Sequence, residues 1–160
     1  MKINTQLRLM GLSSSFSLLF TSLTFGDELE LTLEQCPPAV SKAITENLNG
    51  AKLDEIEKIT IGGRSIYVVE ADLRQGRDLE FHLEASGNLI KWSADTRLKD
   101  VPKAVQDKIT HFGGKLDDLE RVKEKGRETF HAEIKKGNTE YKIVLNTKGE
   151  ELSRITELDD

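Results

Sequence analysis

Three side chains with the chemistry of metal ligands alternate along one short stretch: Glu80, His82 and Glu84. Alternate residues of a β-strand lie on one face of a sheet, about 6.5–7 Å apart. Carboxylates with a histidine suit zinc and similar divalent ions, and Glu70 on a neighbouring strand could join them. The stretch permits a divalent-metal or small-ligand site, and a solvated strand face explains the same pattern.

Nucleophilic catalysis requires a serine or cysteine held beside a base. The chain has three histidines, His82, His111 and His131, and a single cysteine, Cys36. No Gly-x-Ser-x-Gly, His-Glu-x-x-His or phosphate-binding loop occurs in it. We therefore expect no enzymatic activity, no catalytic residues and no cofactor.

The elements that must position these residues come from an internal duplication. Residues 50–59, GAKLDEIEKI, are restated at residues 113–122 as GGKLDDLERV, and such repeats decide architecture. The match extends to both sides of this stretch. It pairs Cys36 with Val101, Gly87 with Gly149, and the trio Glu80, His82 and Glu84 with Lys142, Val144 and Asn146. The metal interpretation thus rests on the first copy alone. Because Cys36 matches Val101, we expect it to be a small buried residue; an intermolecular disulfide is the alternative.

Each copy predicts one amphipathic helix followed by an antiparallel meander. Apolar residues at helical spacing predict a helix over about 38–48, and the same pattern recurs around Val105 and Ile109. Alternating residues predict strands, with a possible bulge in the first. The predicted strands are 55–61, 65–73, 78–84 and 89–92, then 118–123, 128–135, 140–146 and 151–155. We predict an α+β fold of two tandem helix-plus-meander repeats, 27–95 and 96–160, with the helices packed on one face of the sheet.

The other face of the sheet would carry glutamate, histidine and lysine, and must meet water or a partner. Its candidate partner contacts are Glu70, Glu80, His82, His131 and Lys142. We expect a binding or inhibitory module that docks a protein there. A small-ligand or divalent-metal binder using Glu80, His82 and Glu84, and a protein whose open face pairs with itself, are the alternatives.

The first 26 residues have the pattern of a secretory signal. Lys2 and Arg8 precede a short, serine-rich apolar run that ends at Phe25. We predict cleavage after Gly26 and a periplasmic or secreted location; an uncleaved anchor is the alternative reading. The net charge of −5 lacks the basic footprint of a nucleic-acid-binding protein.

The order of these features resembles a known repeat. It runs from a leucine and a proline through an amphipathic helix, Gly-x-Lys-Leu and glycine-separated alternating strands. This order is similar to the PepSY-like, β-lactamase-inhibitor-like (BLIP-like) repeat of secreted bacterial proteins, over about residues 31–157. The resemblance implies two units forming one long curved sheet whose open face grips a partner, such as a peptidase or another envelope enzyme. Inhibitors of this kind carry disulfides and this chain has one cysteine, so β-lactamase inhibition is not implied.

Overall fold

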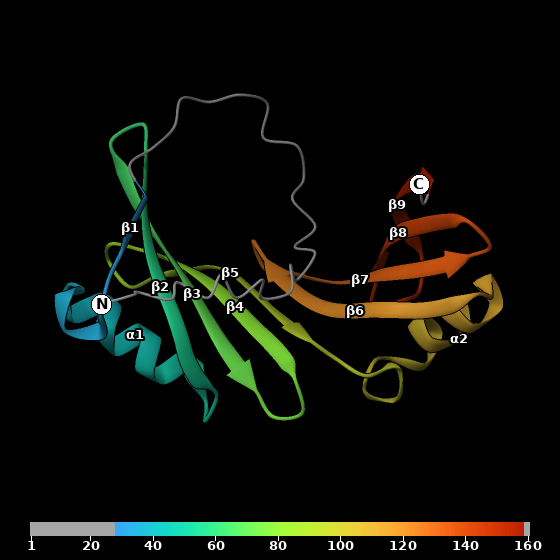
Figure 1. Ribbon diagram of the computed structural model, residues 1–160, viewed down its shortest axis with the longest axis horizontal. Coiled ribbons are helices and arrows are strands. Elements are labelled where there is room, and N and C mark those ends of the chain that lie inside the picture. The colour runs from blue at the N-terminus through green and yellow to red at the C-terminus, as the bar shows by residue number, and fades with distance from the viewer. Residues whose placement is uncertain (1–27, 159–160) are drawn as a thin grey trace, which may run out of the picture.

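The computed structural model describes residues 28–158, so the predicted signal peptide and its cleavage site lie outside the described part of the chain. Nine strands form one antiparallel sheet in which each strand pairs with its neighbours in chain order (Figure 1). The strands are β1 (Glu28–Glu30), β2 (Lys52–Ile61), β3 (Arg64–Leu73), β4 (Arg77–Glu84), β5 (Leu89–Asp95), β6 (Lys115–Glu124), β7 (Arg127–Lys136), β8 (Thr139–Asn146) and β9 (Glu151–Leu158). Two helices, α1 (Pro38–Leu48) and α2 (Lys103–Phe112), each follow a short 3-10 turn.

The α+β class predicted from the sequence is wrong, because the sheet dominates the fold and the two helices are short. A helix followed by four strands does occur twice in chain order. The two sets of strands are not separate meanders, however. β5 continues to Asp95 and pairs with β6, from Lys91 opposite Glu124 to Asp95 opposite Glu120. An unpaired strand edge leaves backbone groups without partners, so joining the two edges produces one sheet. We call this β5–β6 pairing the seam.

Both helices lie on the same side of the sheet, one beneath each half, and the ends of the sheet rise away from them (Figure 1). The opposite face is therefore concave, and we call it the open face. α1 buries Val40, Ala43 and Ile44, and α2 buries Val105 and Ile109, as the helical spacing predicted. Each helix covers its own cluster of buried residues. Among residues 28–158, no helix is long and apolar enough to cross a membrane.

A bulge at the same point of both copies decides which face the acidic side chains occupy. In β2 the register shifts between Leu53 and Glu55, and in β6 between Leu116 and Asp118. Leu53 and Ile56 are three residues apart, yet both stand opposite helix-side residues of β3 because the bulge absorbs one residue. The sequence suggested a bulge within residues 55–61 of the first copy; the structure places it just before, between Leu53 and Glu55, and repeats it in the second copy. Its consequence is that the acids on either side of Ile56 and of its counterpart Leu119 face the open side.

Two matching glycines let each helix approach a hairpin turn. Gly87 lies between β4 and β5 with φ +83°, and a Cβ there would stand 2.6 Å from the carbonyl oxygen of Ala39 in α1. Gly149, between β8 and β9 with φ +75°, makes the same approach to Ala104 of α2. A side chain would meet both a disfavoured backbone conformation and a steric clash. This close packing explains why both copies have glycine at this position.

Candidate functional site

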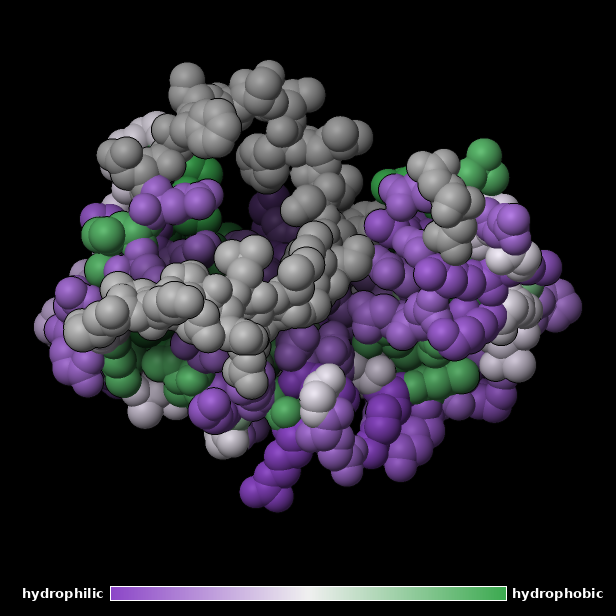
Figure 2. Space-filling view, viewed as in Figure 1, coloured by the Kyte–Doolittle hydropathy of each residue, from purple (hydrophilic) through white to green (hydrophobic). Residues whose placement is uncertain are grey.

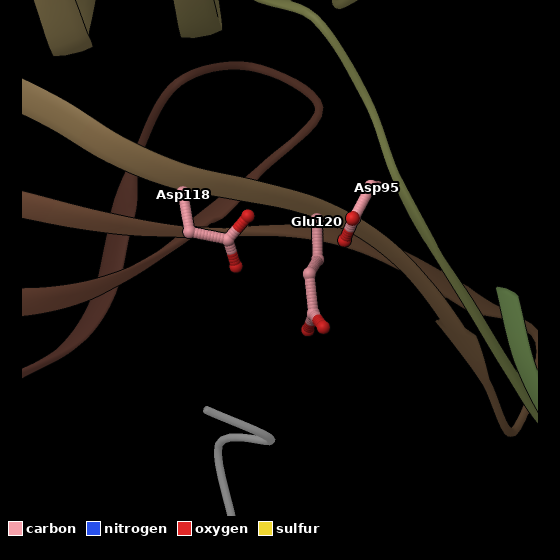
Figure 3. Close-up of side chains that lie close together, drawn as sticks. All are labelled: Asp95, Asp118 and Glu120. Carbon is pink, nitrogen blue, oxygen red and sulfur yellow. The ribbon is translucent and has the colours of Figure 1, made fainter. Parts of the chain in front are cut away.

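Four carboxyl groups from three neighbouring strands gather on the open face at the seam. Asp78 comes from β4, Asp95 from β5, and Asp118 and Glu120 from β6. Asp95 is paired with Glu120 across the seam, and its Oδ2 accepts a 2.9 Å hydrogen bond from the backbone N–H of Asp78. Asp95, Asp118 and Glu120 each offer a carboxylate oxygen within 4.8 Å of the others (Figure 3). We call these four residues the seam acid group.

The seam acid group holds its protons more tightly than ordinary carboxyl groups do. Burial, together with the charges of Asp118 and Asp95, raises the pKa of Glu120 to about 7. Burial is also the main cause that raises the pKa of Asp78, Asp95 and Asp118. None of the ion pairs formed among residues 28–158 involves these four side chains. Their mutual repulsion would be relieved by a cationic group placed against them.

The predicted trio of Glu80, His82 and Glu84 is only partly brought together. Glu80 Oε1 lies 2.9 Å from His82 Nε2 and 2.8 Å from Lys91 Nζ. The hydrogen bond from His82, helped by Lys91, lowers the pKa of Glu80 to about 2. Glu84 instead accepts hydrogen bonds from Ser86 and Asn88 in the following turn. The position beside Glu80 that a metal would need is thus filled by Lys91, a residue that the sequence analysis did not single out.

The other predicted contacts also lie on the open face, with different surroundings. Glu70 is exposed and stands opposite Glu80. His131 stands opposite Glu120, and burial lowers its pKa to about 4. Lys142 forms ion pairs with Glu133, Glu140 and Glu157, at 3.9, 3.5 and 3.2 Å. The five predicted residues therefore share one face, where Glu80 and Lys142 are already neutralised by charges of the protein itself.

A shallow hollow of about 350 Å³ lies at the other end of the seam, beside the turn between β6 and β7. Its lining includes Leu89, Ile90, Lys123 and Arg127. None of the predicted site residues lines it. Figure 2 shows that hydrophilic residues dominate the visible half formed by the second helix and its strands.

Sequence reasoning missed the seam acid group, although one signal for it was present. Asp118 and Glu120 belong to the duplicated stretch and match Glu55 and Glu57 in the first copy. An acid on each side of a core leucine or isoleucine occurs in both copies. That repetition indicates that β2 and β6, the matching strands of the two copies, each carry two acids on the open face. That these acids lie beside Asp78 and Asp95 could not be predicted without knowing that β5 pairs with β6.

Cys36 and Val101, which match between the copies, are both buried. The prediction of a small buried residue at Cys36 is thereby confirmed, and burial raises the pKa of its thiol. A buried thiol with a raised pKa is a poor nucleophile.

The nine-stranded sheet with two helices on one side is similar to several solved structures. A DUF2874 family protein from Bacteroides uniformis shares 19% identity, with a TM-score of 0.59, over 76% of this chain and 89% of that chain. A protein from Bacteroides eggerthii, described as periplasmic, has 18% identity and a TM-score of 0.60, over 76% and 88%. A BLIP-like protein from Bacteroides fragilis has 15% identity and a TM-score of 0.57, over 78% and 89%.

These likenesses establish the fold. The chain has a BLIP-like fold, as the order of its sequence motifs predicted. The link to PepSY proteins stays a prediction. No protein-family model and no curated protein matches the chain.

Proposed function

We propose that the protein is a non-enzymatic binding protein of the cell envelope that docks a protein partner on its open face. The partner would present lysine or arginine side chains to the seam acid group. The observation that carries this proposal is the gathering of Asp78, Asp95, Asp118 and Glu120 without an ion-pair partner among residues 28–158.

The charge distribution supports a basic partner. Elsewhere on the open face Glu80 is neutralised by Lys91, and Lys142 by three carboxylates. The seam acid group is thus an acidic centre between the charge pairs of Glu80 and of Lys142. Glu55, Glu57 and Glu70 add further acidic side chains to the same face. Charge complementarity of this kind gives specificity and fast association more than raw affinity. It also makes binding sensitive to salt, because added ions screen exposed charges.

The shape of the sheet and its structural neighbours support a protein as the occupant. No described helix covers the open face, and its concavity can receive a convex surface (Figure 1). One neighbour of the same fold is described as periplasmic and another as BLIP-like. The predicted signal peptide supports the same compartment. We infer that the chain acts outside the cytoplasm by binding rather than by catalysis.

The test is a capture experiment with a matched pair of variants. The purified chain is immobilised and exposed to envelope extract of the source cell at low and high salt. The open-face variant carries Asp118→Asn with Glu120→Gln. The control carries Glu46→Gln with Asp107→Asn, which replaces one glutamate and one aspartate on the exposed helical side, where these acids pair with Lys42 and Lys103.

A protein retained by the native chain and by the control, and bound about ten-fold more weakly by the open-face variant, would support the proposal. Its binding should weaken as salt rises. Equal retention by all three chains would overturn it. A calorimetric titration with calcium, magnesium and zinc ions covers the remaining outcome. If the native chain retains no protein but releases or absorbs heat on binding one of these ions, and the open-face variant does not, the site is a divalent-cation site and the docking proposal is wrong.

A further inference from the structure

The two edges of the sheet differ sharply in how they are protected. β1 has three residues, Glu28–Glu30, and pairs only with β2. β9 has eight residues, Glu151–Leu158, and pairs only with β8. An edge strand offers a row of unpaired backbone groups to any other strand, and short edges limit this. The long edge formed by β9 is therefore the place where strand pairing can continue.

β9 also lacks the residues that usually block such pairing. It contains neither proline nor lysine, the residues that most often guard an edge. Leu152, Ile155 and Leu158 are 58%, 40% and 78% exposed. These three make up half of the exposed large hydrophobic residues among residues 28–158. An exposed, apolar and extended edge of this kind is typical of an interaction surface.

The charges of β9 are neutralised within its own molecule. Arg154 forms two hydrogen bonds to the carboxylate of Glu151, at 2.8 and 2.9 Å. Glu157 lies 3.2 Å from Lys142 Nζ on the neighbouring strand. Each of these charged side chains of β9 thus has a partner of opposite charge in its own molecule.

The register of β9 favours pairing with itself. Ile155 stands opposite Lys142 and so lies on the open face, whereas Arg154 stands opposite the core residue Ile143 on the helix side. If two copies pair antiparallel about a two-fold axis perpendicular to the sheet, each face continues into the same face of the other copy. Directly opposed residues must then come from the same face. The registers with the longest overlap are centred on Arg154 or on Ile155.

The register centred on Ile155 is the complementary one. It places Ile155 opposite the same residue of the second copy. By sequence count it sets Leu158 against Leu152, the residue that the bulge in β9 leaves without a partner on β8. The register centred on Arg154 places two guanidinium groups opposite each other. Apolar cross-strand pairs each contribute about 0.2–1 kcal/mol, and like charges directly opposite destabilise.

We propose that β9 is a self-association edge, at which a second copy of this chain pairs antiparallel in the register centred on Ile155. The product is a two-fold dimer with one continuous sheet and a helix-free face running across both copies. A single strand pair buries less surface than a standard stable interface, so the dimer forms at micromolar concentrations or above.

Sedimentation equilibrium of the purified chain, from about 1 µM to about 1 mM, measures this association. Native chain should pass from monomer to dimer. Ile155→Lys should remain monomeric across the range. The control Leu29→Lys places the same change on the opposite edge, at a residue 54% exposed, and should dimerise like the native chain. A native chain that stays monomeric, an Ile155→Lys variant that still dimerises, or assembly beyond the dimer would each overturn the proposal.

Oxidative cross-linking tests the register itself. In a Cys36→Ser background, Ile155→Cys places two thiols opposite each other across the two-fold axis. Ser153→Cys places its thiol opposite Glu157 of the other copy and is the matched control. Ile155→Cys should form a disulfide-linked dimer about ten-fold faster than Ser153→Cys, because disulfides require opposed Cβ atoms. Equal rates would reject this register. The seam variants Asp118→Asn and Glu120→Gln should leave dimerisation unchanged, which separates this proposal from partner docking.

Discussion

Glu57 and Glu120 hold matching positions in the two copies of one repeated strand, yet their surroundings differ. Burial raises the pKa of both, but only that of Glu120 reaches about 7. β2 has the short edge strand β1 as its outer neighbour, whereas β6 is paired with β5 at the seam. Glu120 consequently stands opposite Asp95, inside the sheet. The position of a strand in the sheet, rather than its own sequence, gives the repeated acid its electrostatic character.

Glu80 and Lys142 are a second matching pair, and here the sign of the charge is reversed. Glu80 receives the cationic Lys91 and hydrogen-bonds His82, while Lys142 is surrounded by Glu133, Glu140 and Glu157. Each copy neutralises the residue at this position with its own neighbours. The seam, which belongs to neither copy alone, gathers acidic groups without such pairing. Glu55, Glu57 and Glu70 form a second group of acids on the open face, in the first copy.

The largest expected effect tests whether the two helix–hairpin contacts are equivalent. Gly87→Ala and Gly149→Ala should each destabilise the protein by about 2–4 kcal/mol, because a side chain at positive φ would also clash with a helix carbonyl. Urea unfolding measures both. Gly62→Ala, at φ +58° with nothing within 4 Å of its Cβ, is the control and should cost about 1 kcal/mol. Equal losses at all three glycines would show that helix packing is not the cause.

Glu80→Gln should reduce stability at pH 7 by about 2 kcal/mol, after allowing for partial exposure of the pair. The pKa of Glu80 is lowered to about 2 from an ordinary value of 4.5. Its stabilising contribution is therefore complete above pH 4.5 and lost as the pH falls toward 2. Unfolding followed against pH should show this loss in the native chain and not in the variant. The same acid-induced loss in both chains would contradict the assignment.

Glu120→Gln should have the opposite sign and stabilise the protein by about 1–2 kcal/mol at pH 8, again discounted for exposure. The folded state holds the proton of Glu120 up to about pH 7, compared with an ordinary pKa of 4.5. Stability of the native chain therefore falls as the pH rises from 4.5 to 7, and the gain from the variant vanishes below pH 4.5. Glu57→Gln is the matched change in the first copy, and its gain should be clearly smaller. Equal gains in stability from Glu57→Gln and Glu120→Gln would show that the position of the strand in the sheet makes no difference.

The smallest expected effect concerns a cation–π contact at the seam. Lys123 Nζ lies 5.3 Å from the ring centroid of Trp92, the only tryptophan of the chain. Lys123→Gln should cost about 0.5–1 kcal/mol and alter the fluorescence of Trp92. Lys125→Gln, in the adjacent turn, should change neither. An unchanged emission spectrum in Lys123→Gln would contradict the contact.

Much of the local structure followed from the sequence. The helix over Pro38–Leu48 and the turn glycines were predictable, because spacing, backbone preference and burial act within a few residues. The common face of Glu70, Glu80 and His82 also followed from alternation along their strands. Glu84 was the exception, since its side chain turns to the hairpin beside it.

The sequence by itself determined that two copies of one unit exist, which residues form each core, and that acids accompany Leu119 on its strand. Only the tertiary structure decided that β5 runs on to Asp95 and pairs with β6, which makes one sheet of the two units. The seam acid group depends on this pairing, because Asp78, Asp95 and Glu120 are brought together by neighbouring strands and not by spacing along the chain. Such contacts arise from strand edges that need partners, and alternation within a strand carries no information about which edge it will meet.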